Sequence, residues 1–388
     1  MQLTAQRYDT LRPARLTIAD GKLADVVDLA GNADAPPDLY VAPAFFDLQI
    51  NGHAGIWFGD PGLTVDQVLT VLEAHFAHGI SRLCPTLITN SFEGIRDGLA
   101  VIRAACEQEP WADRMVPGCH VEGPYISAED GPRGAHPLEH VRGCNVEEFD
   151  RWQAASGDRI RLITLAPEAP GAAEFTRALT SRGVRVAIGH TAASTDQIAA
   201  VVDTGATLST HLGNGAAGMM RRHPNPIWDQ LADDRLSASV IADGHHLPAS
   251  VLQVMIRAKG VERIVLTCDA SGLAGLPPGV YDYHGAKFEV LADGPIVIAG
   301  QRQYLAGSGQ MTDICVANAI ALGGVTLQQA CDMAGRTPSR LLGIEQVTLT
   351  AGARADLVLF RWPGAGAPLE ILATLADGVL RHGTIDLD

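Results

Sequence analysis

Four residues that can bind a metal ion or transfer a proton each stand where a short apolar run ends. Glu122 closes CHVE, His190 closes VAIGH, His211 closes LSTH and Asp269 closes IVLTCD. Two imidazoles and a carboxylate are the donor set of a catalytic zinc site with one open position, and a further carboxylate can act as acid and base. Together the four residues predict a metal-dependent hydrolytic site.

Each of these residues also has an ordinary structural use. A single histidine after a strand is commonly a hydrogen-bonded loop residue, Glu122 is a candidate helix cap, and Asp269 a candidate N-cap. Their shared position after strands favours the metal site, because active sites of (β/α)₈ enzymes lie at the carboxyl ends of the strands. His120, two residues before Glu122, is expected to pack below the site, since a catalytic metal needs an open position.

The segments that carry these residues alternate between strand-like and helix-like patterns. Helical patterns such as TVDQVLTVLEAHFAHG separate eight apolar or β-branched runs. The strand candidates are residues 41–50, 80–89, 115–123, 159–167, 184–190, 206–211, 236–244 and 262–270. Such alternation is typical of an α/β fold with parallel strands. Eight units across about 300 residues predict a (β/α)₈ TIM-type barrel and fit a doubly wound sheet less well.

The two ends of the chain have a different sequence pattern from the middle part. Residues 1–42 and 346–388 hold short alternating runs with turns, so we expect both termini to form one small β-sandwich domain. Residues 43–345 would then be the hydrolase barrel. Residues 271–310 are rich in glycine, and we expect long irregular loops there, around the barrel mouth.

Composition excludes several classes of protein. The 388 residues are 47% hydrophobic and 19% charged, as in a globular chain, and the formal charge of −15 argues against nucleic acid or an anionic membrane as the main partner. Seven cysteines without a C-x-x-C pair predict reduced thiols. The sequence shows neither a secretory leader nor an apolar run of about 18 residues, so we expect a cytoplasmic protein.

The stretch DLQINGHAG follows the first apolar run and carries four polar residues. Strict alternation along a strand would place Asp47, Gln49, Asn51 and His53 on one face. They are candidates for metal ligands, for substrate contacts, or for a polar strand end.

These motifs resemble those of the N-acetylglucosamine-6-phosphate deacetylases, a family of the amidohydrolase superfamily. The resemblance covers most of the chain: FFDLQINGHAG, PTLITNS, HVEGPYIS, GAH, GHT, THLGN, ADGHH, CDA, LAGS and GARADLVLF. HVEGP followed by GAH and THLGN is the most specific combination.

The resemblance implies an activity and a role for each matching residue. The activity is hydrolysis of N-acetylglucosamine 6-phosphate to glucosamine 6-phosphate and acetate. Glu122, His190 and His211 would bind the metal, Asp269 would be the general base and acid, and His136 would polarise the acetyl carbonyl. The implied substrate contacts are Ala135, His136, Asn214, Gly215, Arg222, His246, Leu305, Ala306 and Gly307.

The resemblance also implies a cofactor and an assembly. We expect one divalent ion per subunit, zinc foremost, with iron, manganese or cobalt also compatible with the donor set. The small-molecule partner would be an acetamido sugar, in a protein that forms a homodimer.

One segment departs from the family pattern. MMRRHPNPIW stands where an H/G-R-E-P run is usual, so Arg222 is kept while His223 replaces the glutamate. An unphosphorylated or epimeric acetamido sugar, or an N-acyl-amino acid, therefore stays open as the substrate. A non-catalytic binding protein on the same fold is the alternative of another class, and the presence of all four site residues argues against it.

The first strand bears on the number of metal ions. Many amidohydrolases have His-x-His there to hold a second metal, and this chain has Gln49 and Asn51, whose neutral amides are poor ligands. We therefore expect one metal, with both amides hydrogen-bonded to each other, to water or to substrate. Asp47 would anchor neighbouring strands, and His53 would not bind the metal.

Overall fold

Eight parallel strands form the barrel in the computed structural model, which describes residues 1–30, 35–283, 285–301 and 305–385. The strands are β5 (Phe45–Ile50), β8 (Ile80–Ile88), β9 (Cys119–Glu122), β10 (Ile160–Leu165), β11 (Arg185–Ile188), β12 (Leu208–Ser209), β13 (Ser237–Ile241) and β14 (Ile264–Thr267). They pair in chain order, and a parallel bridge from Ile50 to Ala270 brings the last strand back to the first. The predicted barrel and its eight strands are confirmed.

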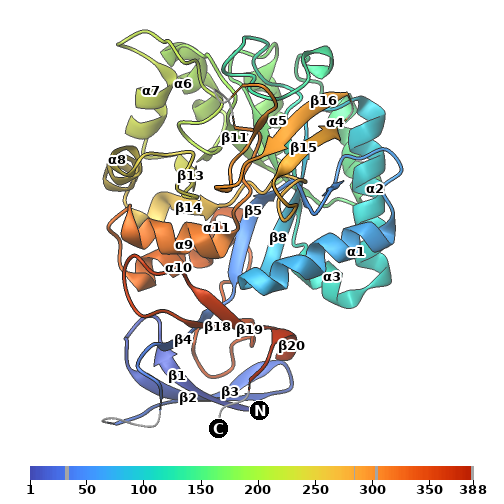
Figure 1. The fold of residues 1–388 in the computed structure, drawn as a ribbon. Coiled ribbons are helices and arrows are strands. Elements are labelled where there is room, and N and C mark those ends of the chain that lie inside the picture. The colour runs from blue at the N-terminus through green and yellow to red at the C-terminus, as the bar shows by residue number, and fades with distance from the viewer. Residues whose placement is uncertain (31–34, 284, 302–304, 386–388) are drawn as a thin grey trace.

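Helices surround the barrel, as Figure 1 shows. They are α1 (Val65–Ala74), α2 (Phe92–Gln108), α3 (Pro110–Met115), α4 (Val146–Ser156), α5 (Ala172–Thr180), α6 (Thr195–Asp203), α7 (Pro226–Ala232), α8 (Ala249–Lys259), α9 (Thr312–Ala321), α10 (Leu327–Ala334) and α11 (Arg336–Leu342). Capping boxes at Thr64, Ser194 and Thr326 fix where α1, α6 and α10 begin, because side chain and backbone satisfy each other's free donors. In the part of the chain that the structure describes, no helix is both long and apolar enough to span a membrane.

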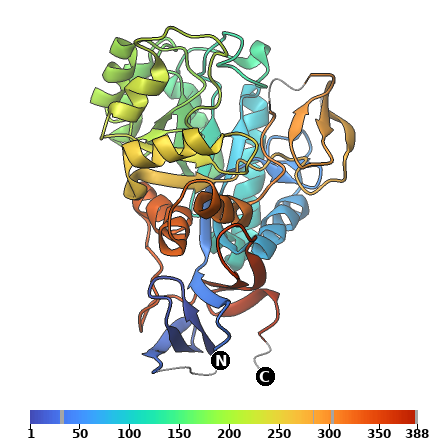
Figure 2. The ribbon, with the colours of Figure 1, turned by 60° about the vertical axis from the view of Figure 1, so that its left-hand side comes forward.

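Both termini build a second sheet below the barrel (Figures 1 and 2). Its seven strands pair in the order β20-β19-β18-β4-β1-β2-β3. Their bounds are β1 (Gln2–Arg7), β2 (Pro13–Ala19), β3 (Lys22–Asp28), β4 (Leu39–Pro43), β18 (Leu357–Arg361), β19 (Glu370–Ala376) and β20 (Val379–Gly383). The predicted small domain from the two ends is confirmed, with its strands joined in one hydrogen-bonded sheet.

Two sequence predictions about elements were wrong. The run predicted as one strand over residues 41–50 divides at Ala44, with β4 in the lower sheet and β5 in the barrel. Residues 271–310 include an antiparallel sheet of β15 (Gly279–Tyr283), β16 (Ala286–Val290) and β17 (Ile296–Ile298), which stands beside the barrel mouth (Figure 2). The alternating pattern GVYDY could have predicted this hairpin, but the high glycine content of the segment favoured a prediction of loops.

The strict alternation predicted for the stretch 47–53 is also wrong. The pairing of β5 with β8 shifts between Asp47 and Ile50. Leu48 belongs to an apolar cluster contributed by several barrel strands, while the adjacent Gln49 reaches the carboxylates of Glu122 and Asp269. This shift is what allows the first strand to contribute both to the barrel core and to the site above it.

Asp47 joins the first and last strands of the barrel. Its buried carboxylate accepts hydrogen bonds from the backbone N–H of Gln49 (2.9 Å) and of Cys268 (2.8 Å). The hydroxyls of Thr267 and Thr312 donate to it as well. Burial raises the pKa of Asp47, and the four donors oppose that rise by stabilising the ionised form. The carboxylate therefore fastens the seam where the barrel closes, as expected of a strand-anchoring residue.

We expect Asp47→Ala to destabilise the barrel strongly. Four buried donors would lose their acceptor, and each such loss costs about 1–3 kcal/mol. Chemical denaturation followed by circular dichroism measures the change in unfolding midpoint. The exposed residue Asp97 provides a control, because Asp97→Ala should change stability by no more than about 0.5 kcal/mol. Equal midpoints for the two variants would contradict the anchoring role.

Candidate metal centre and active site

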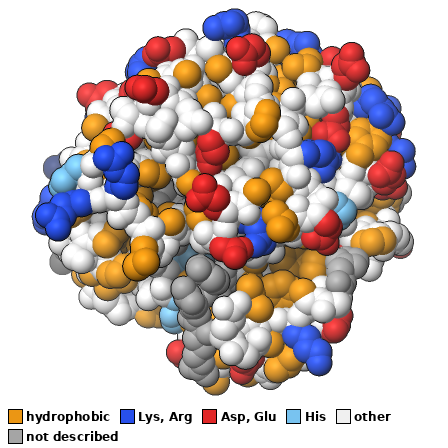
Figure 3. All heavy atoms as spheres, turned by 90° about the horizontal axis from the view of Figure 1, so that it is seen from above, with side chains coloured by type: hydrophobic (Ala, Val, Ile, Leu, Met, Phe, Trp, Pro, Cys, Tyr) orange, Lys and Arg blue, Asp and Glu red, His pale blue; other side chains and the backbone are white. Residues whose placement is uncertain are grey.

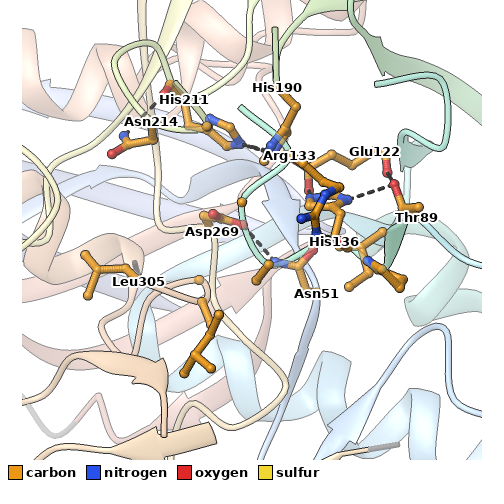
Figure 4. Close-up of a pocket in the computed structure, with 18 of the residues that line it drawn as sticks. Asn51, Thr89, Glu122, Arg133, His136, His190, His211, Asn214, Asp269 and Leu305 are labelled. Atoms are coloured by element: carbon orange, nitrogen blue, oxygen red, sulfur yellow. Dashed lines mark hydrogen bonds and ion pairs between the residues drawn. The ribbon is translucent and has the colours of Figure 1, made fainter. Parts of the chain in front are cut away.

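The four strand-end residues converge on one point above the barrel (Figure 4). Oε1 of Glu122 lies 2.8 Å from Nε2 of His211 and 3.2 Å from Nε2 of His190. The two Nε2 atoms are 3.1 Å apart, and all three side chains are buried. Ligands at about 2.0–2.1 Å from a tetrahedral zinc ion are roughly 3.4 Å from one another. A divalent ion therefore fits among these atoms with a small outward adjustment.

The backbone at three of these positions is left-handed. His190, His211 and Asp269 have φ values of 51°, 29° and 52°. Such a conformation costs a residue with a side chain on the order of 1–3 kcal/mol, and it persists at functional sites where the surroundings enforce it. The three residues each follow the end of a barrel strand by two positions, so the strain accompanies the turn that places their side chains beside Glu122.

Hydrogen bonding fixes His190 in the form that binds metal. Its Nδ1 lies 2.8 Å from the carbonyl oxygen of Pro132, which can only accept a hydrogen bond. Nδ1 therefore carries the proton, and Nε2 presents a lone pair toward Glu122 and His211. This carbonyl–histidine arrangement is usual behind metal-bound imidazoles.

A second histidine competes for the role of third ligand. Glu122, His136 and His190 also offer ligand atoms within 4.8 Å of one another. Nε2 of His136 is 4.0 Å from Oε2 of Glu122, whereas His211 lies 2.8 Å from Oε1. We favour His211, because its nitrogen faces both other ligand atoms.

Gln49 and Asn51 hold the two carboxylates of the site. Nε2 of Gln49 donates to Oε1 of Glu122 (2.9 Å) and to Oδ1 of Asp269 (3.0 Å), and Nδ2 of Asn51 donates to the same Oδ1 (2.7 Å). From the sequence we expected the two amides to hydrogen-bond to each other, to water or to substrate. The carboxylates were not predicted as partners. Both amide nitrogens are thus used as hydrogen-bond donors to carboxylates, and the expectation of a single metal ion stays a prediction.

The electrostatics separate the two carboxylates. Burial opposes ionisation of Glu122, but the two imidazoles of His190 and His211 beside it hold the pKa of Glu122 well below its ordinary value. Burial, followed by the charge of Glu122, raises the pKa of Asp269 to about 7. Glu122 therefore stays ionised while Asp269 changes charge near neutral pH.

A cavity of about 1190 Å³ opens above this centre. The predicted contacts that line it are Ala135, His136, Asn214, Gly215, His246, Leu305, Ala306 and Gly307. Arg222 is exposed and lies outside this lining, so the structure does not bring it to the other predicted residues. The cavity wall includes Arg133 instead, whose Nη1 donates to the carbonyl oxygen of His136 (2.9 Å). Arg133 directly precedes the motif GAH, and this position could have identified it from the sequence.

Three further histidines have neighbours that fix their rings. Nε2 of His120 is 2.8 Å from the hydroxyl of Thr164, so this nitrogen already has a hydrogen-bond partner. The ring of His53 packs against His75 at a centroid distance of 5.5 Å and does not line the cavity. Nδ1 of His246 lies 2.7 Å from Oδ2 of Asp243, which orients its ring at the cavity wall.

The face seen from above the barrel mouth carries both signs of charge. Figure 3 shows acidic and basic side chains interspersed around hydrophobic ones, without a continuous basic field. This distribution suits a small-molecule cavity better than a phosphate backbone.

Comparison with known proteins identifies the family. The family model described as "Amidohydrolase family" matches residues 40–381. The chain belongs to the amidohydrolases. This amidohydrolase is 36% identical over 348 residues to N-acetylgalactosamine-6-phosphate deacetylase of Escherichia coli O157:H7, with 89% of each chain covered. It is 34% identical to N-acetylglucosamine-6-phosphate deacetylase of Bos taurus, covering 90% of this chain and 85% of the other.

Solved structures agree with this placement within the amidohydrolases. N-acetyl-D-glucosamine-6-phosphate deacetylase of Mycobacterium smegmatis superimposes with a TM-score of 0.87 at 31% identity, covering 98% of this chain and 99% of that one. A mutant of that protein, solved in complex with N-acetyl-D-glucosamine-6-phosphate, gives a TM-score of 0.86. The amidohydrolase therefore belongs to the N-acetylglucosamine-6-phosphate deacetylase family, as the motifs predicted.

We expect Glu122→Gln to remove the metal from this amidohydrolase. The amide keeps the shape of the side chain but loses the charge that faces both imidazoles. Loss of an outer partner alone typically weakens metal binding about 10–100-fold, and loss of a ligand should cost at least as much. Metal analysis of purified protein measures the stoichiometry. His120→Gln is the matched control, since that ring contacts Thr164 and should leave the metal content near that of the wild type. Stoichiometric metal in Glu122→Gln would exclude the ligand assignment.

Proposed function

We propose that the protein hydrolyses the acetamide of an N-acetyl amino sugar 6-phosphate, with N-acetylglucosamine 6-phosphate as the first candidate, to give glucosamine 6-phosphate and acetate. The observation that carries the proposal is the convergence of Glu122, His190 and His211 beside the hydrogen-bonded carboxylate of Asp269. The choice of substrate is supported by the relatives, which are named as deacetylases of such sugar phosphates.

Glu122, His190 and His211 would hold one divalent ion, zinc foremost, which when bound supplies Lewis acidity and lowers the pKa of a water molecule to about 7. The donor chemistry fits this ion, because His190 presents a lone pair and Glu122 is ionised. The role of the remaining side chains follows from their hydrogen bonds.

Asp269 is the proposed proton carrier. Its Oδ1 accepts hydrogen bonds from Gln49 and Asn51, so these amides orient the carboxylate and leave Oδ2 for the reacting proton. Asp269 takes that proton from the attacking water and returns it to the amide nitrogen as the C–N bond breaks. The return step is needed because an unprotonated amine anion is a poor leaving group.

His136 is the proposed donor to the developing oxyanion. It is buried in the cavity wall, and its Nε2 lies on the side of Glu122. The negative charge that forms on the acetyl oxygen is then stabilised by an N–H group already in place. Deleting one such donor typically lowers the rate by about 10²–10³.

The configuration of the sugar has two candidates. One relative, at 36% identity, is named for the galactosamine epimer, and relatives at 34% and 35% are named for the glucosamine sugar. Among the described residues, Arg133 supplies a guanidinium to the cavity wall that could meet a phosphate, whereas Arg222 lies outside the lining. Zinc as the metal, a homodimer and a cytoplasmic location stay predictions.

A panel of four substrates tests this function. We expect N-acetylglucosamine 6-phosphate and N-acetylgalactosamine 6-phosphate to release acetate faster than the two unphosphorylated sugars, because the phosphate adds binding energy. Initial rates of acetate release with metal-analysed protein give kcat/KM for each. Faster turnover of the unphosphorylated sugars would show that the preferred substrate carries no phosphate. Absence of acetate from all four reactions would contradict the proposed deacetylation.

We expect Asp269→Asn to keep the metal while kcat falls by about 10²–10⁴, the usual contribution of a positioned acid and base. The amide can still accept hydrogen bonds from Gln49 and Asn51 but cannot carry the proton. Acetate release and metal content should be measured on the same preparation. Near-wild-type turnover would show that another group moves the proton.

A further inference from the structure

Thr89 directly follows β8 and contacts the histidine proposed to stabilise the oxyanion. Its side chain is buried, and Oγ1 lies 2.8 Å from Nδ1 of His136 (Figure 4). The same oxygen is 3.4 Å from the carbonyl oxygen of Glu122. The contact raises the question of which atom holds the proton between Thr89 and His136.

The distances answer that question for the hydroxyl. O–H···O hydrogen bonds are about 2.5–3.0 Å long, so the 3.4 Å contact with the Glu122 carbonyl is weak. The imidazole nitrogen at 2.8 Å is the better acceptor. The hydroxyl of Thr89 therefore donates to Nδ1 of His136, which leaves the ring proton on Nε2.

The charge on the other side of the ring favours the same tautomer. Nε2 of His136 faces Oε2 of Glu122 at 4.0 Å. An N–H at this position is attracted by the carboxylate, whereas a lone pair would be repelled. The contacts at Nδ1 and at Nε2 therefore both favour a proton on Nε2.

Two neighbouring histidines are thereby assigned opposite tautomers. The rings of His136 and His190 have centroids 4.2 Å apart. His190 donates from Nδ1 to the carbonyl of Pro132 and keeps its Nε2 lone pair for a metal ion. His136 accepts at Nδ1 and keeps a proton at Nε2, so it can donate to an oxygen but cannot ligate a cation there.

We propose that Thr89 is a positioning residue: it fixes the Nε2–H tautomer of His136, which makes that ring a hydrogen-bond donor to the substrate's carbonyl oxygen and excludes it from the metal. The catalytic part of this inference rests on the proposed deacetylation. The tautomer itself does not.

Gly123 leaves room for the Thr89 hydroxyl. A Cβ at Gly123 would lie 2.2 Å from Oγ1 of Thr89, and Gly123 has a φ of +80°. The glycine that follows Glu122 therefore leaves the space that the hydroxyl occupies.

Nitrogen NMR of the zinc-loaded holoenzyme with ¹⁵N-labelled histidine tests the tautomer directly. Protonated and unprotonated ring nitrogens differ strongly in chemical shift, and His136→Gln identifies the signals of residue 136 among the 13 histidines. We expect a protonated Nε2 in the wild type, and a shift toward the Nδ1–H form in Thr89→Ala. Thr89→Ser should restore the wild-type signals, because it keeps the hydroxyl.

Kinetics on the same variants test the catalytic consequence. We expect kcat of Thr89→Ala to fall by about 10–10², below the full loss of an oxyanion donor, while KM and metal content stay near the wild-type values. Thr89→Ser should recover most of kcat. If Thr89→Ala does not fold, Thr89→Val replaces the hydroxyl by a methyl group of similar size.

Three results would overturn the inference: a proton on Nδ1 of His136 in the wild type, unchanged kcat in Thr89→Ala, or loss of metal from that variant. The failure of the proposed function looks different. In that case no sugar releases acetate, yet the Thr89-dependent signal of His136 persists, and the tautomer assignment stands.

Discussion

The structure is organised around one carboxylate oxygen, Oε1 of Glu122. Two imidazole nitrogens and the amide of Gln49 all lie within 3.2 Å of it, and the side chain of Glu122 is buried. Buried ionised groups are costly unless opposite charge and hydrogen bonds compensate them. A divalent cation provides that compensation, and the left-handed backbone at His190 and His211 shows that the turns after the strands accept strain to bring the donors together.

Histidines at this site have different roles because they have different hydrogen-bond partners. His120, His136 and His190 are all buried near the same carboxylate, yet one is paired with Thr164, one with Thr89 and one with the carbonyl of Pro132. The partner of Nδ1 in His136 and His190 determines whether the opposite nitrogen binds a cation or donates a proton. Gln49 and Asn51 are oriented by their partners in the same way, because their amide nitrogens donate to the carboxylates of Glu122 and Asp269.

The barrel and the site depend on each other through the first strand. Asp47 fastens β5 to the segment after β14, and the register shift between Asp47 and Ile50 accompanies the turn of Gln49 toward the ligands. Asp269 lies two residues beyond β14, across this seam, where Gln49 and Asn51 both reach it. The closure of the barrel therefore also sets the orientation of the proposed proton carrier.

The barrel, the small domain from both termini and the family could be predicted from the amino-acid sequence, because eight apolar runs and the motifs at their ends are local patterns of residues. The sequence also indicated Glu122, His190, His211 and Asp269, since strand ends in a (β/α)₈ fold converge by topology. The division of residues 41–50 between two sheets, the partners of Gln49 and the exposure of Arg222 were decided only in three dimensions. So was the contact between Thr89 and His136, which lie 47 residues apart. The physical reason is that register shifts and hydrogen-bond direction depend on neighbours that are distant in the chain, and no local pattern of residues encodes them.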